Sequence, residues 1–244
     1  MTRRILGDRL DGLIRAIPGG SALAQAVLRL IDPERRALHA LRERRDLHLF
    51  QPFPETFEDR YPELFDALVL RLARLEAPRI LSFGCSRGME VRALRQRLPL
   101  AEITGIDVNA WALDRARQAD PDPRSRYILA DAPDPSERYD AVLAMAVFRH
   151  GQIELERPED CAAILPFADV AAGIARLDAV LRPGGWLAIY NAHFRFADMP
   201  VAGHYRAEPF RMTDHAPQTL LYGPDNRRID GTEYDAVLFR KAPG

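Results

Sequence analysis

This sequence of 244 residues has little lysine, little cysteine and no long apolar run. These features limit the functions and locations that the protein can have. Lys241 is the only lysine among 34 basic residues, and 35 acidic residues bring the net charge to −1. That balance provides no general attraction to nucleic acid or to an anionic membrane. The two cysteines, Cys85 and Cys161, have neither a disulfide nor a metal-ligand spacing, which favours a reducing cytoplasm and no metal site.

No apolar run approaches the ~18–20 residues of a membrane-spanning helix, and the arginine-containing start lacks the apolar core of a signal peptide. We therefore expect a cytoplasmic location and no membrane partner. With 47% apolar residues the chain can bury a full core, so one domain with a small extension is the natural arrangement. No pattern in the sequence specifies an oligomeric state.

A short loop that contains two glycines is the most informative feature of the chain. An apolar run at 80–83 ends in the sequence Gly-Cys-Ser-Arg-Gly at 84–88, and an amphipathic helix pattern follows. Gly84 leaves the end of the strand open to a ligand, and Gly88 lets the next helix pack closely on the sheet. A strand, a glycine loop and a helix in this order predict a ligand site at the end of a parallel strand.

An acid at the end of the next apolar run completes this pattern. The run 103–106 ends in Asp107, 23 residues after Gly84, close to the ~20-residue spacing of an acid that binds ribose hydroxyls. The loop and the acid together predict a nucleoside-binding site in an open parallel sheet.

Three more strands and a terminal hairpin are predicted downstream. A helix pattern at 177–181 stops at the Arg-Pro-Gly-Gly turn 182–185, because proline cannot continue the helix and glycine ends it. The predicted strands are 127–130, 139–147 and 186–190. Two short apolar runs, 218–222 and 236–240, are separated by turn-forming residues and predict an antiparallel hairpin.

Five motifs in this order carry a resemblance to the class I S-adenosylmethionine-dependent methyltransferases, over about residues 78 to 191. The motifs are the loop 84–88, Asp107, Ala130-Asp131-Ala132, Tyr139-Asp140-Ala141-Val142, and Leu181-Arg182-Pro183-Gly184-Gly185-Trp186. The resemblance implies an α/β fold with a Rossmann-like, doubly wound sheet of seven strands, the last strand antiparallel. It also implies an N-terminal helical segment, residues 1–76, and a cofactor-binding methyltransferase domain, residues 77–244.

The resemblance implies S-adenosylmethionine as the cofactor and a small molecule or a peptide as the methyl acceptor. The expected cofactor contacts are the backbone of Gly84, Cys85, Ser86 and Gly88 for the methionine part, Asp107 for the ribose, and Val108, Asp131 and Ala132 for the adenine. In particular, the carboxylate of Asp131 is expected to bind the adenine amino group, and Ala132 to flank the ring.

The loop departs from the usual pattern of this family at Ser86, where a glycine or an alanine is common. Its sequence is closer to the Gly-Cys-Ser-x-Gly-x-Glu loop of the chemotaxis-receptor glutamate methyltransferases, with Glu90 at their second glutamate. This likeness covers about ten residues and keeps protein carboxylate O-methylation open as an alternative. A module that binds S-adenosylmethionine without turnover is a further alternative, because the same residues would bind the cofactor.

Methyl transfer from a sulfonium is an in-line displacement that mainly requires alignment, with a base if the acceptor carries a proton. The candidate catalytic residues are His150 after the fourth strand and His193 after the fifth, because imidazole changes its protonation near neutral pH. The fourth strand lacks the Asn/Asp-Pro-Pro-aromatic and Pro-Cys motifs of nucleic-acid base methyltransferases. No nucleic-acid partner is therefore expected.

The loop 84–88 also matches Gly-x-Ser-x-Gly, the nucleophile elbow of serine hydrolases, with Ser86 as the nucleophile. Two features argue against this alternative. The elbow normally follows several strands, whereas the residues before this loop have helical patterns, and no His-Gly-Gly-type oxyanion loop lies upstream. A hydrolase would also leave Asp107 without a role.

Two stretches precede the first predicted strand. Residues 1–46 alternate apolar residues and arginine at helical spacing, which predicts a helical cap with a solvated charged face. Residues 48–62 are rich in proline and aromatic side chains and cannot form one continuous helix. Phe50, Phe53 and Phe57 are expected either to pack as core under the N-terminal helices or to fold across the cofactor as a lid.

Overall fold

The computed structural model describes residues 32–44, 49–51, 57–210, 212, 219–229 and 236–244. The chain divides into two units, Met1–Arg44 and Arg45–Gly244. The helices predicted before residue 32 lie outside the described residues, as does Phe53. None of the helices in these described ranges is both long enough and apolar enough to cross a membrane.

In the first unit, helix α3 (Pro33–Glu43) begins directly after Asp32. The carboxylate of Asp32 accepts hydrogen bonds from the backbone N–H groups of Glu34 at 2.9 Å and Arg35 at 3.3 Å. Proline at the first helical position lacks an N–H group that would otherwise need a partner. The start of this helix is therefore set by its own local sequence.

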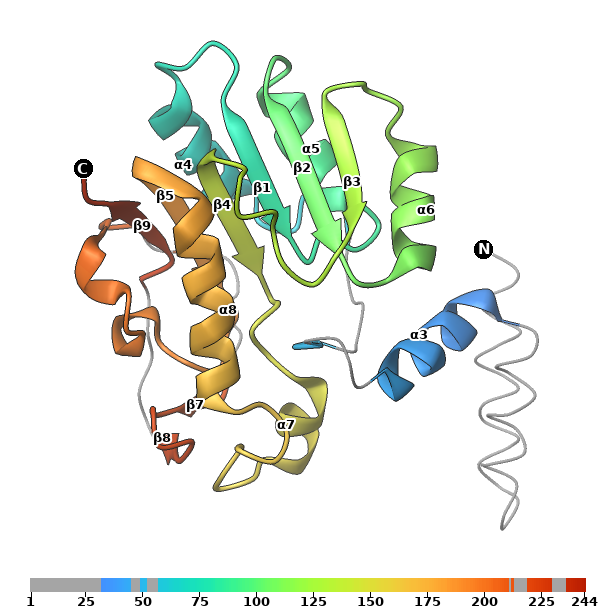
Figure 1. Cartoon of the computed structure of the whole chain (residues 1–244), viewed down its shortest axis with the longest axis vertical. Helices are drawn as coiled ribbons and strands as arrows, with labels where there is room; N and C mark the ends of the chain where they lie inside the picture. The colour runs from blue at the N-terminus through green and yellow to red at the C-terminus, as the bar shows by residue number, and fades with distance from the viewer. Residues whose placement is uncertain (1–31, 45–48, 52–56, 211, 213–218, 230–235) are drawn as a thin grey trace. The chain divides into compact units, whose positions relative to one another are not determined.

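The second unit is a sheet with helices on both faces (Figure 1). Its helices are α4 (Pro62–Leu72), α5 (Met89–Arg97), α6 (Ala110–Ala119), α7 (Gly151–Glu156) and α8 (Phe167–Val180), with short 3-10 helices at Phe196–Asp198 and Ala202–His204. Its strands are β1 (Arg79–Phe83), β2 (Glu102–Asp107), β3 (Ser125–Leu129), β4 (Tyr139–Met145), β5 (Leu181–Tyr190), β6 (Tyr205–Ala207), β7 (Leu221–Tyr222), β8 (Arg228–Ile229) and β9 (Leu238–Lys241).

Seven of these strands form one sheet in the order β3-β2-β1-β4-β5-β9-β6. Strands β1 to β5 run parallel, and β9 pairs antiparallel with both β5 and β6. The predicted seven-stranded, doubly wound sheet with its last strand antiparallel is confirmed. The strand order reverses between β1 and β4, so the crevice that binds ligands in such sheets lies outside the carboxyl ends of these two strands.

The predicted terminal hairpin is wrong in its first strand. The run at 221–222 pairs with Arg228–Ile229 in a separate two-stranded sheet, whereas β9 pairs with β6, from residues 205–207. A short apolar run next to a turn predicts a strand but not its partner strand. The partner depends on which segments lie next to each other in the folded chain.

Alternate residues of the central strands supply two separate cores. Leu81 and Val142 face the α8 side, where Ile174 and other apolar residues of that helix cover them. Ile80 and Leu143, their immediate neighbours, face the opposite side together with apolar residues of α4, α5 and α6. Figure 1 shows α8 in front of the sheet and α4 and α5 behind it. Both faces of the strands are buried, as expected for a parallel sheet between helices.

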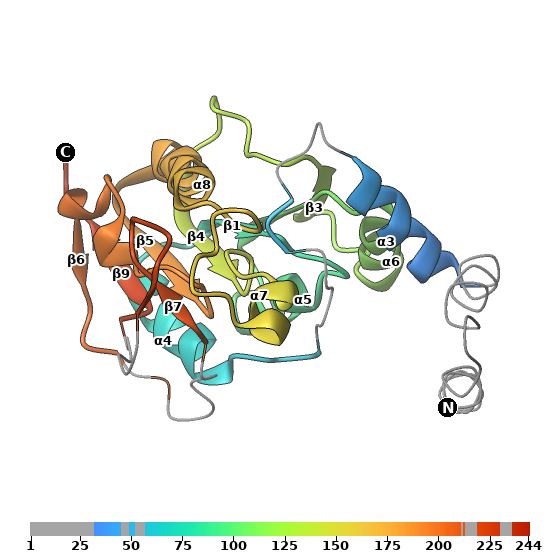
Figure 2. The same cartoon turned by 90° about the horizontal axis from the view of Figure 1, so that it is seen from below.

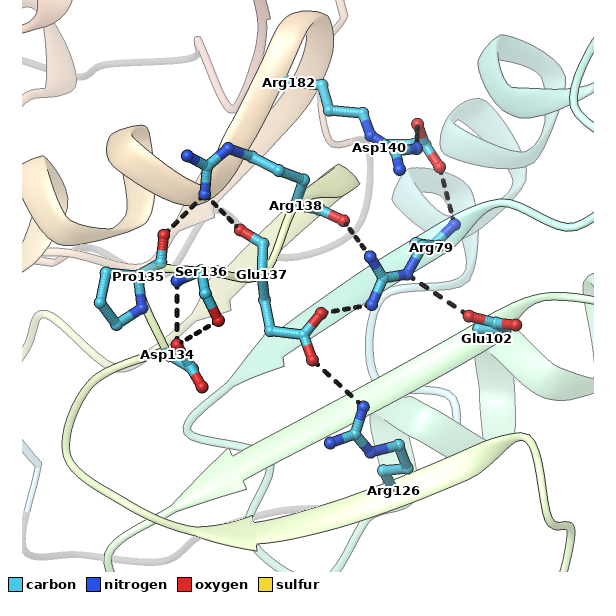
Figure 3. Close-up of polar contacts among 10 residues, drawn as sticks. All are labelled: Arg79, Glu102, Arg126, Asp134, Pro135, Ser136, Glu137, Arg138, Asp140 and Arg182. Atoms are coloured by element: carbon cyan, nitrogen blue, oxygen red, sulfur yellow. Dashed lines mark hydrogen bonds and ion pairs between the residues drawn. The ribbon is translucent and has the colours of Figure 1, made fainter.

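Charged side chains link the amino ends of the strands (Figure 3). Arg79, at the start of β1, pairs with Glu137 and lies 3.4 Å from the carboxylate of Glu102 on β2. Its backbone N–H donates to Asp140 of β4 at 2.8 Å, and Asp140 also accepts from Arg182 of β5. This network closes the amino edge of the sheet with protein groups, and the ligand crevice lies at the opposite edge.

Candidate active site

The loop between β1 and α5 begins at Gly84, which has a left-handed φ of +75°. A Cβ atom at this position would lie 2.5 Å from Cγ2 of Val147, just beyond the end of β4. The backbone N–H groups of Gly84 and Cys85 donate to the carbonyl oxygen of Ile106 at 2.8 and 3.0 Å. The loop is thus tied to β2 and touches the end of β4, and a side chain at its first position would have no room.

Gly88 ends the loop with a φ of +72°. A Cβ atom there would lie 2.7 Å from the hydroxyl oxygen of Tyr127 and 3.0 Å from Cβ of Ala116. The sequence predicts Gly88 as a position of close packing, and the neighbours it approaches come from β3 and α6. The start of α5 therefore depends on this glycine for both its backbone conformation and its fit.

Asp107 ends β2 and faces the glycine loop. Its Oδ2 accepts a hydrogen bond from the backbone N–H of Ser86 at 2.7 Å, and its Oδ1 accepts one from the N–H of Asn109 at 2.8 Å. Burial raises the pKa of Asp107, and the backbone N–H groups of Asn109 and Ser86 oppose that rise. Each carboxylate oxygen has more than one acceptor site, so Asp107 can hold the loop and still accept ligand hydroxyls.

Backbone strain gathers at three neighbouring strand ends. Ser86 after β1, Ala146 after β4 and Asn191 after β5 have positive φ values of 48°, 58° and 57°. Such conformations cost roughly 1–3 kcal/mol each in residues other than glycine and are typical of functional sites. The hydroxyl oxygen of Ser86 is also buried without a hydrogen-bond partner among the described residues. No described histidine makes a hydrogen bond to this oxygen, as activation of a serine nucleophile would require.

The predicted adenine contacts lie near the end of the same sheet edge. Register pairs Asp107 with Leu129, the last residue of β3, so the segment with Asp131 and Ala132 continues beyond that edge. Val108 follows Asp107 directly, and the N–H of Ala130 donates to the carbonyl of Asp107 at 3.1 Å. The structure brings these residues to one corner of the crevice, and their adenine contacts stay predictions.

The side chain of Cys85 points into the core and away from any ligand. It is buried, and a Cβ atom on Gly105 of β2 would lie 2.8 Å from its Sγ. Burial raises the pKa of this thiol well above its ordinary value, so it stays protonated and unreactive. The side chain is therefore unsuited to contact a cofactor, and the predicted contact through the backbone of Cys85 stays a prediction.

Glu90 is a site residue that the sequence marks only through its likeness to another loop. It lies in the first turn of α5, and its Oε1 accepts a hydrogen bond from the hydroxyl of Ser82 on β1 at 2.6 Å. Burial raises the pKa of Glu90 to about 7, and the hydroxyl of Ser82 acts in the opposite direction. In the described part of the chain no cationic side chain pairs with this carboxylate. When Glu90 is ionised, its negative charge therefore lies beside the glycine loop without a counterion from these residues.

A cavity of about 490 Å³ lies beyond the end of β4. Ala146 lines it, next in sequence to the Val147 that fills the space beside Gly84. Arg149 and Glu154 also line it, with the Nη2 atom of Arg149 at 3.2 Å from Oε1 of Glu154. The sequence does not mark these two side chains, because their meeting depends on how the segment after β4 turns into α7.

His193 is fully buried just beyond β5. Its Nδ1 lies 2.8 Å from the carbonyl oxygen of Leu220, to which it donates, and its Nε2 lies 3.9 Å from Oε1 of Glu154. Burial lowers the pKa of His193 to about 4, so the imidazole is neutral near neutral pH. His193 therefore contacts the cavity wall through Glu154, and its catalytic role stays a prediction.

His150 lies at the start of α7. Its Nδ1 accepts a hydrogen bond from the backbone N–H of Gln152 at 3.2 Å, which assigns the ring proton to Nε2. The side chain is only half-buried. The structure thus brings both predicted histidines to the end of the sheet that holds Gly84 and Asp107, with His150 the more accessible of the two. Within the described ranges no three histidine, cysteine or acidic side chains gather to hold a metal ion.

The predicted aromatic stretch divides between core and surface. Phe50 is buried edge-to-face against Phe148, with ring centroids 5.0 Å apart. Phe57, by contrast, exposes 59% of its surface. Phe50 is thus core, as one of the two expectations had it, but it packs against Phe148 and beside Gly173 of α8. Packing of this stretch under the N-terminal helices and its closure over a cofactor both stay predictions.

A family profile described as "Methyltransferase domain" matches residues 81–189, from the first strand to the fifth. A ubiquinone biosynthesis O-methyltransferase of Bradyrhizobium sp. (strain ORS 278) is 30% identical over 212 residues, which are 79% of this chain and 75% of that protein. A trans-aconitate 2-methyltransferase of Paracidovorax citrulli (strain AAC00-1) is 31% identical over 137 residues, which are 54% of this chain and 46% of that protein.

The chain spans less than half the length of several curated relatives that it matches, for example 24% of one and 46% of another. A solved structure of an amino pentose methyltransferase from Micromonospora echinaspora, bound to its methyl donor, has a TM-score of 0.42 and 24% identity. That match covers 64% of this chain and 58% of the other.

Proposed function

The chain belongs to the class I S-adenosylmethionine-dependent methyltransferases, and we propose that it transfers the methyl group of this cofactor to a small organic molecule. The observation that carries the proposal is the contact between Asp107 and the backbone N–H of Ser86 at 2.7 Å. It places the acid of β2 and the glycine loop of β1 at one crevice, as nucleoside binding in an open parallel sheet requires.

The residues of this crevice fit the cofactor. The buried hydroxyl of Ser86 has no hydrogen-bond partner among the described residues, and the Asp107 carboxylate has acceptor capacity left. The space beside Gly84 is filled by Val147, so this glycine fits the loop against β4. The proposed contacts are the backbone of residues 84–88 for the methionine part, Asp107 for the ribose, and Val108, Asp131 and Ala132 for the adenine. When bound, the cofactor supplies an electrophilic methyl group on a sulfonium, and the protein supplies alignment.

Glu90 is proposed to bind the α-ammonium group of the methionine part. A buried carboxylate without a cationic protein partner is costly, and a ligand cation beside it restores the interactions that burial removes. Glu90 lies in the turn that follows the glycine loop, and Ser82 orients its Oε1. The carboxylate must be ionised for this role, so cofactor affinity should depend on pH.

We predict that Glu90→Gln weakens S-adenosylhomocysteine binding about tenfold at pH 8, because one charge-assisted hydrogen bond contributes ~1.5–3 kcal/mol. The pKa of Glu90 near 7 makes the wild-type affinity fall as the pH is lowered from 8 to 6, while the variant's affinity stays constant over that range. Calorimetric titrations at several pH values measure both effects.

A matched ligand provides the control for Glu90. 5′-Methylthioadenosine has the same adenine, ribose and thioether but no amino acid group, so its affinity should be equal for the wild type and Glu90→Gln. If Glu90→Gln lowered the affinity for this smaller ligand as much as the affinity for S-adenosylhomocysteine, the carboxylate would act through the loop and not through the ammonium group.

The names of the relatives support a small acceptor, since they refer to trans-aconitate and to ubiquinone biosynthesis. The cavity of about 490 Å³ beyond the end of β4 has the size of a small-molecule site. The neutral His193 is suited to positioning, because it holds Leu220 and approaches Glu154 on the cavity wall. His150, more accessible, is proposed to orient the acceptor.

The function is tested by calorimetry and by product analysis on the full chain. A methyltransferase binds S-adenosylmethionine and releases S-adenosylhomocysteine when a panel of small acceptors is supplied. Binding with no product for any small-molecule, peptide or protein acceptor would favour a module without turnover. Methyl transfer confined to protein carboxylates would replace the small acceptor. Absence of binding, with fluorophosphonate labelling of Ser86, would favour the hydrolase.

A further inference from the structure

The cavity beyond β4 is where an acceptor can meet the methyl group. Figure 2, which looks onto the carboxyl ends of the strands, shows α7 beyond the end of β4. Residues from both the strand end and this helix line the cavity, among them Ala146 and Gln152. Ala146 follows β4, and β4 is the neighbour of β1 in the sheet, so this wall of the cavity lies at the strand end next to the one that carries the glycine loop. In this fold, acceptors approach the strand ends at this point.

The described part of the cavity wall has two arginines and one acidic side chain. Arg60 and Arg149 line it, together with Gln51 and Gln152. The acidic side chain among these described residues is Glu154, and burial raises its pKa while Arg149 opposes that rise. A small anion is the ligand that such a wall attracts.

Arg149 has capacity for a further partner. Its side chain exposes 21% of its surface, and its ion pair with Glu154 joins Nη2 to Oε1 at 3.2 Å. Its Nε is buried without a hydrogen-bond partner among the described residues, and Oε1 of Glu154 also lacks a well-aligned hydrogen bond. One imperfect pair therefore uses little of the five-donor guanidinium, whose planar fork matches a carboxylate.

We propose that the methyl acceptor carries a carboxylate and that Arg149 binds it in this cavity, with Arg60 adding attraction. This inference rests on the proposed function and specifies its substrate class. Arginine suits the role because its charge does not titrate in the physiological range and its fork fixes the orientation of a planar anion. Holding the carboxylate at α7 would leave the rest of the acceptor to face the loop at Gly84.

The test compares acids with neutral amides of nearly the same shape, in the presence of saturating S-adenosylhomocysteine. The pairs are succinate and succinamide, cinnamate and cinnamamide, and octanoate and octanamide, measured by calorimetry. At least one acid is expected to bind at least tenfold more tightly than its amide. Arg149→Gln should lower the affinity for that acid at least tenfold. Arg149→Lys should lower this affinity less, and Arg60→Gln should lower it severalfold.

Arg124→Gln is the matched control, because it removes the same charge at the amino edge of the sheet, where Arg124 is 48% exposed. It should leave acid binding unchanged, and all variants should bind S-adenosylhomocysteine as the wild type does. Three results would overturn this inference and leave the proposed function standing. They are amides that bind as well as acids, no binding of any acid, and equal effects of Arg149→Gln and Arg124→Gln. If the wild type failed to bind S-adenosylhomocysteine, the proposed function would fall with it.

Discussion

Asp107→Ala is expected to weaken binding of S-adenosylhomocysteine and of 5′-methylthioadenosine by at least tenfold. Two hydrogen bonds from the ribose to a carboxylate contribute ~1.5–3 kcal/mol each, and ~1.4 kcal/mol corresponds to tenfold in affinity. The loss should be equal for both ligands, because they share the ribose. This result differs from that of Glu90→Gln, which should affect only the ligand with an amino acid group.

The same substitution also removes the acceptor for two backbone N–H groups. Ser86 and Asn109 donate to Asp107 at 2.7 and 2.8 Å, so the loop at 84–88 should loosen and the free energy of unfolding should fall by ~1–3 kcal/mol. Part of the lost affinity could therefore come from a displaced loop. Calorimetry with both ligands and thermal unfolding of the ligand-free protein measure the two contributions.

Asn109→Ala is a control for lost stability alone, because it leaves the hydrogen bond from Ser86 to Asp107 in place. The side chain of Asn109 caps α6 by accepting a hydrogen bond from the N–H of Ala112 at 3.2 Å, so its removal should destabilise the protein by ~1 kcal/mol. It takes no ribose contact away, and its ligand affinity should stay within about threefold of wild type. The ribose assignment is rejected if Asp107→Ala binds both ligands as tightly as this control does.

Gly88→Ala is expected to lower the free energy of unfolding by about 2–5 kcal/mol. A left-handed conformation costs a residue with a Cβ roughly 1–2 kcal/mol, and forcing an atom into a packed space costs about 1–3 kcal/mol more. The new Cβ would lie 2.7 Å from the hydroxyl of Tyr127, which itself donates to Asp120 at 2.8 Å. Thermal unfolding should show a fall of roughly 4–20 °C for a chain of this size.

Gly184→Ala is the matched control for this prediction. Gly184 has a φ of +74°, almost the same as the +72° of Gly88, but no atom lies within 4 Å of a Cβ built there. Its substitution should therefore cost only the conformational part, about 1–2 kcal/mol. If both variants lost the same free energy of unfolding, Tyr127 would move aside without an energetic cost. The close approach of α5 to β3 would then contribute nothing to stability.

Local patterns in the sequence predict the central fold and much of the cofactor crevice. The runs around 80–83 and 103–106 form strands because continuous apolar segments between glycine loops suit buried parallel strands. Gly84 and Gly88 are recognisable because only glycine tolerates left-handed backbone against packed neighbours. Asp107 is recognisable by its position at a strand end. These features depend on residues close to one another in the chain.

The less successful predictions involve partners that are distant in sequence. The run at 221–222 does form a strand, but the seventh position in the sheet is taken by residues 205–207. The contact of His193 with the carbonyl of Leu220 is likewise one that no spacing along the chain predicts, and the proposed role of His193 as a base or acceptor-orienting group stays a prediction. Pairing and burial of this kind follow from how separate segments meet after folding.

The sequence by itself determined the order of strands and helices, the glycine bend and the acid that faces it, because sterics and hydrophobic periodicity act between near neighbours. Only the tertiary structure decided that Glu90 lies against Ser82, and that Arg149 and Glu154 share one cavity wall. Desolvation and charge pairing depend on groups that folding brings together from different segments, so local patterns in the sequence do not predict the proposed acceptor site.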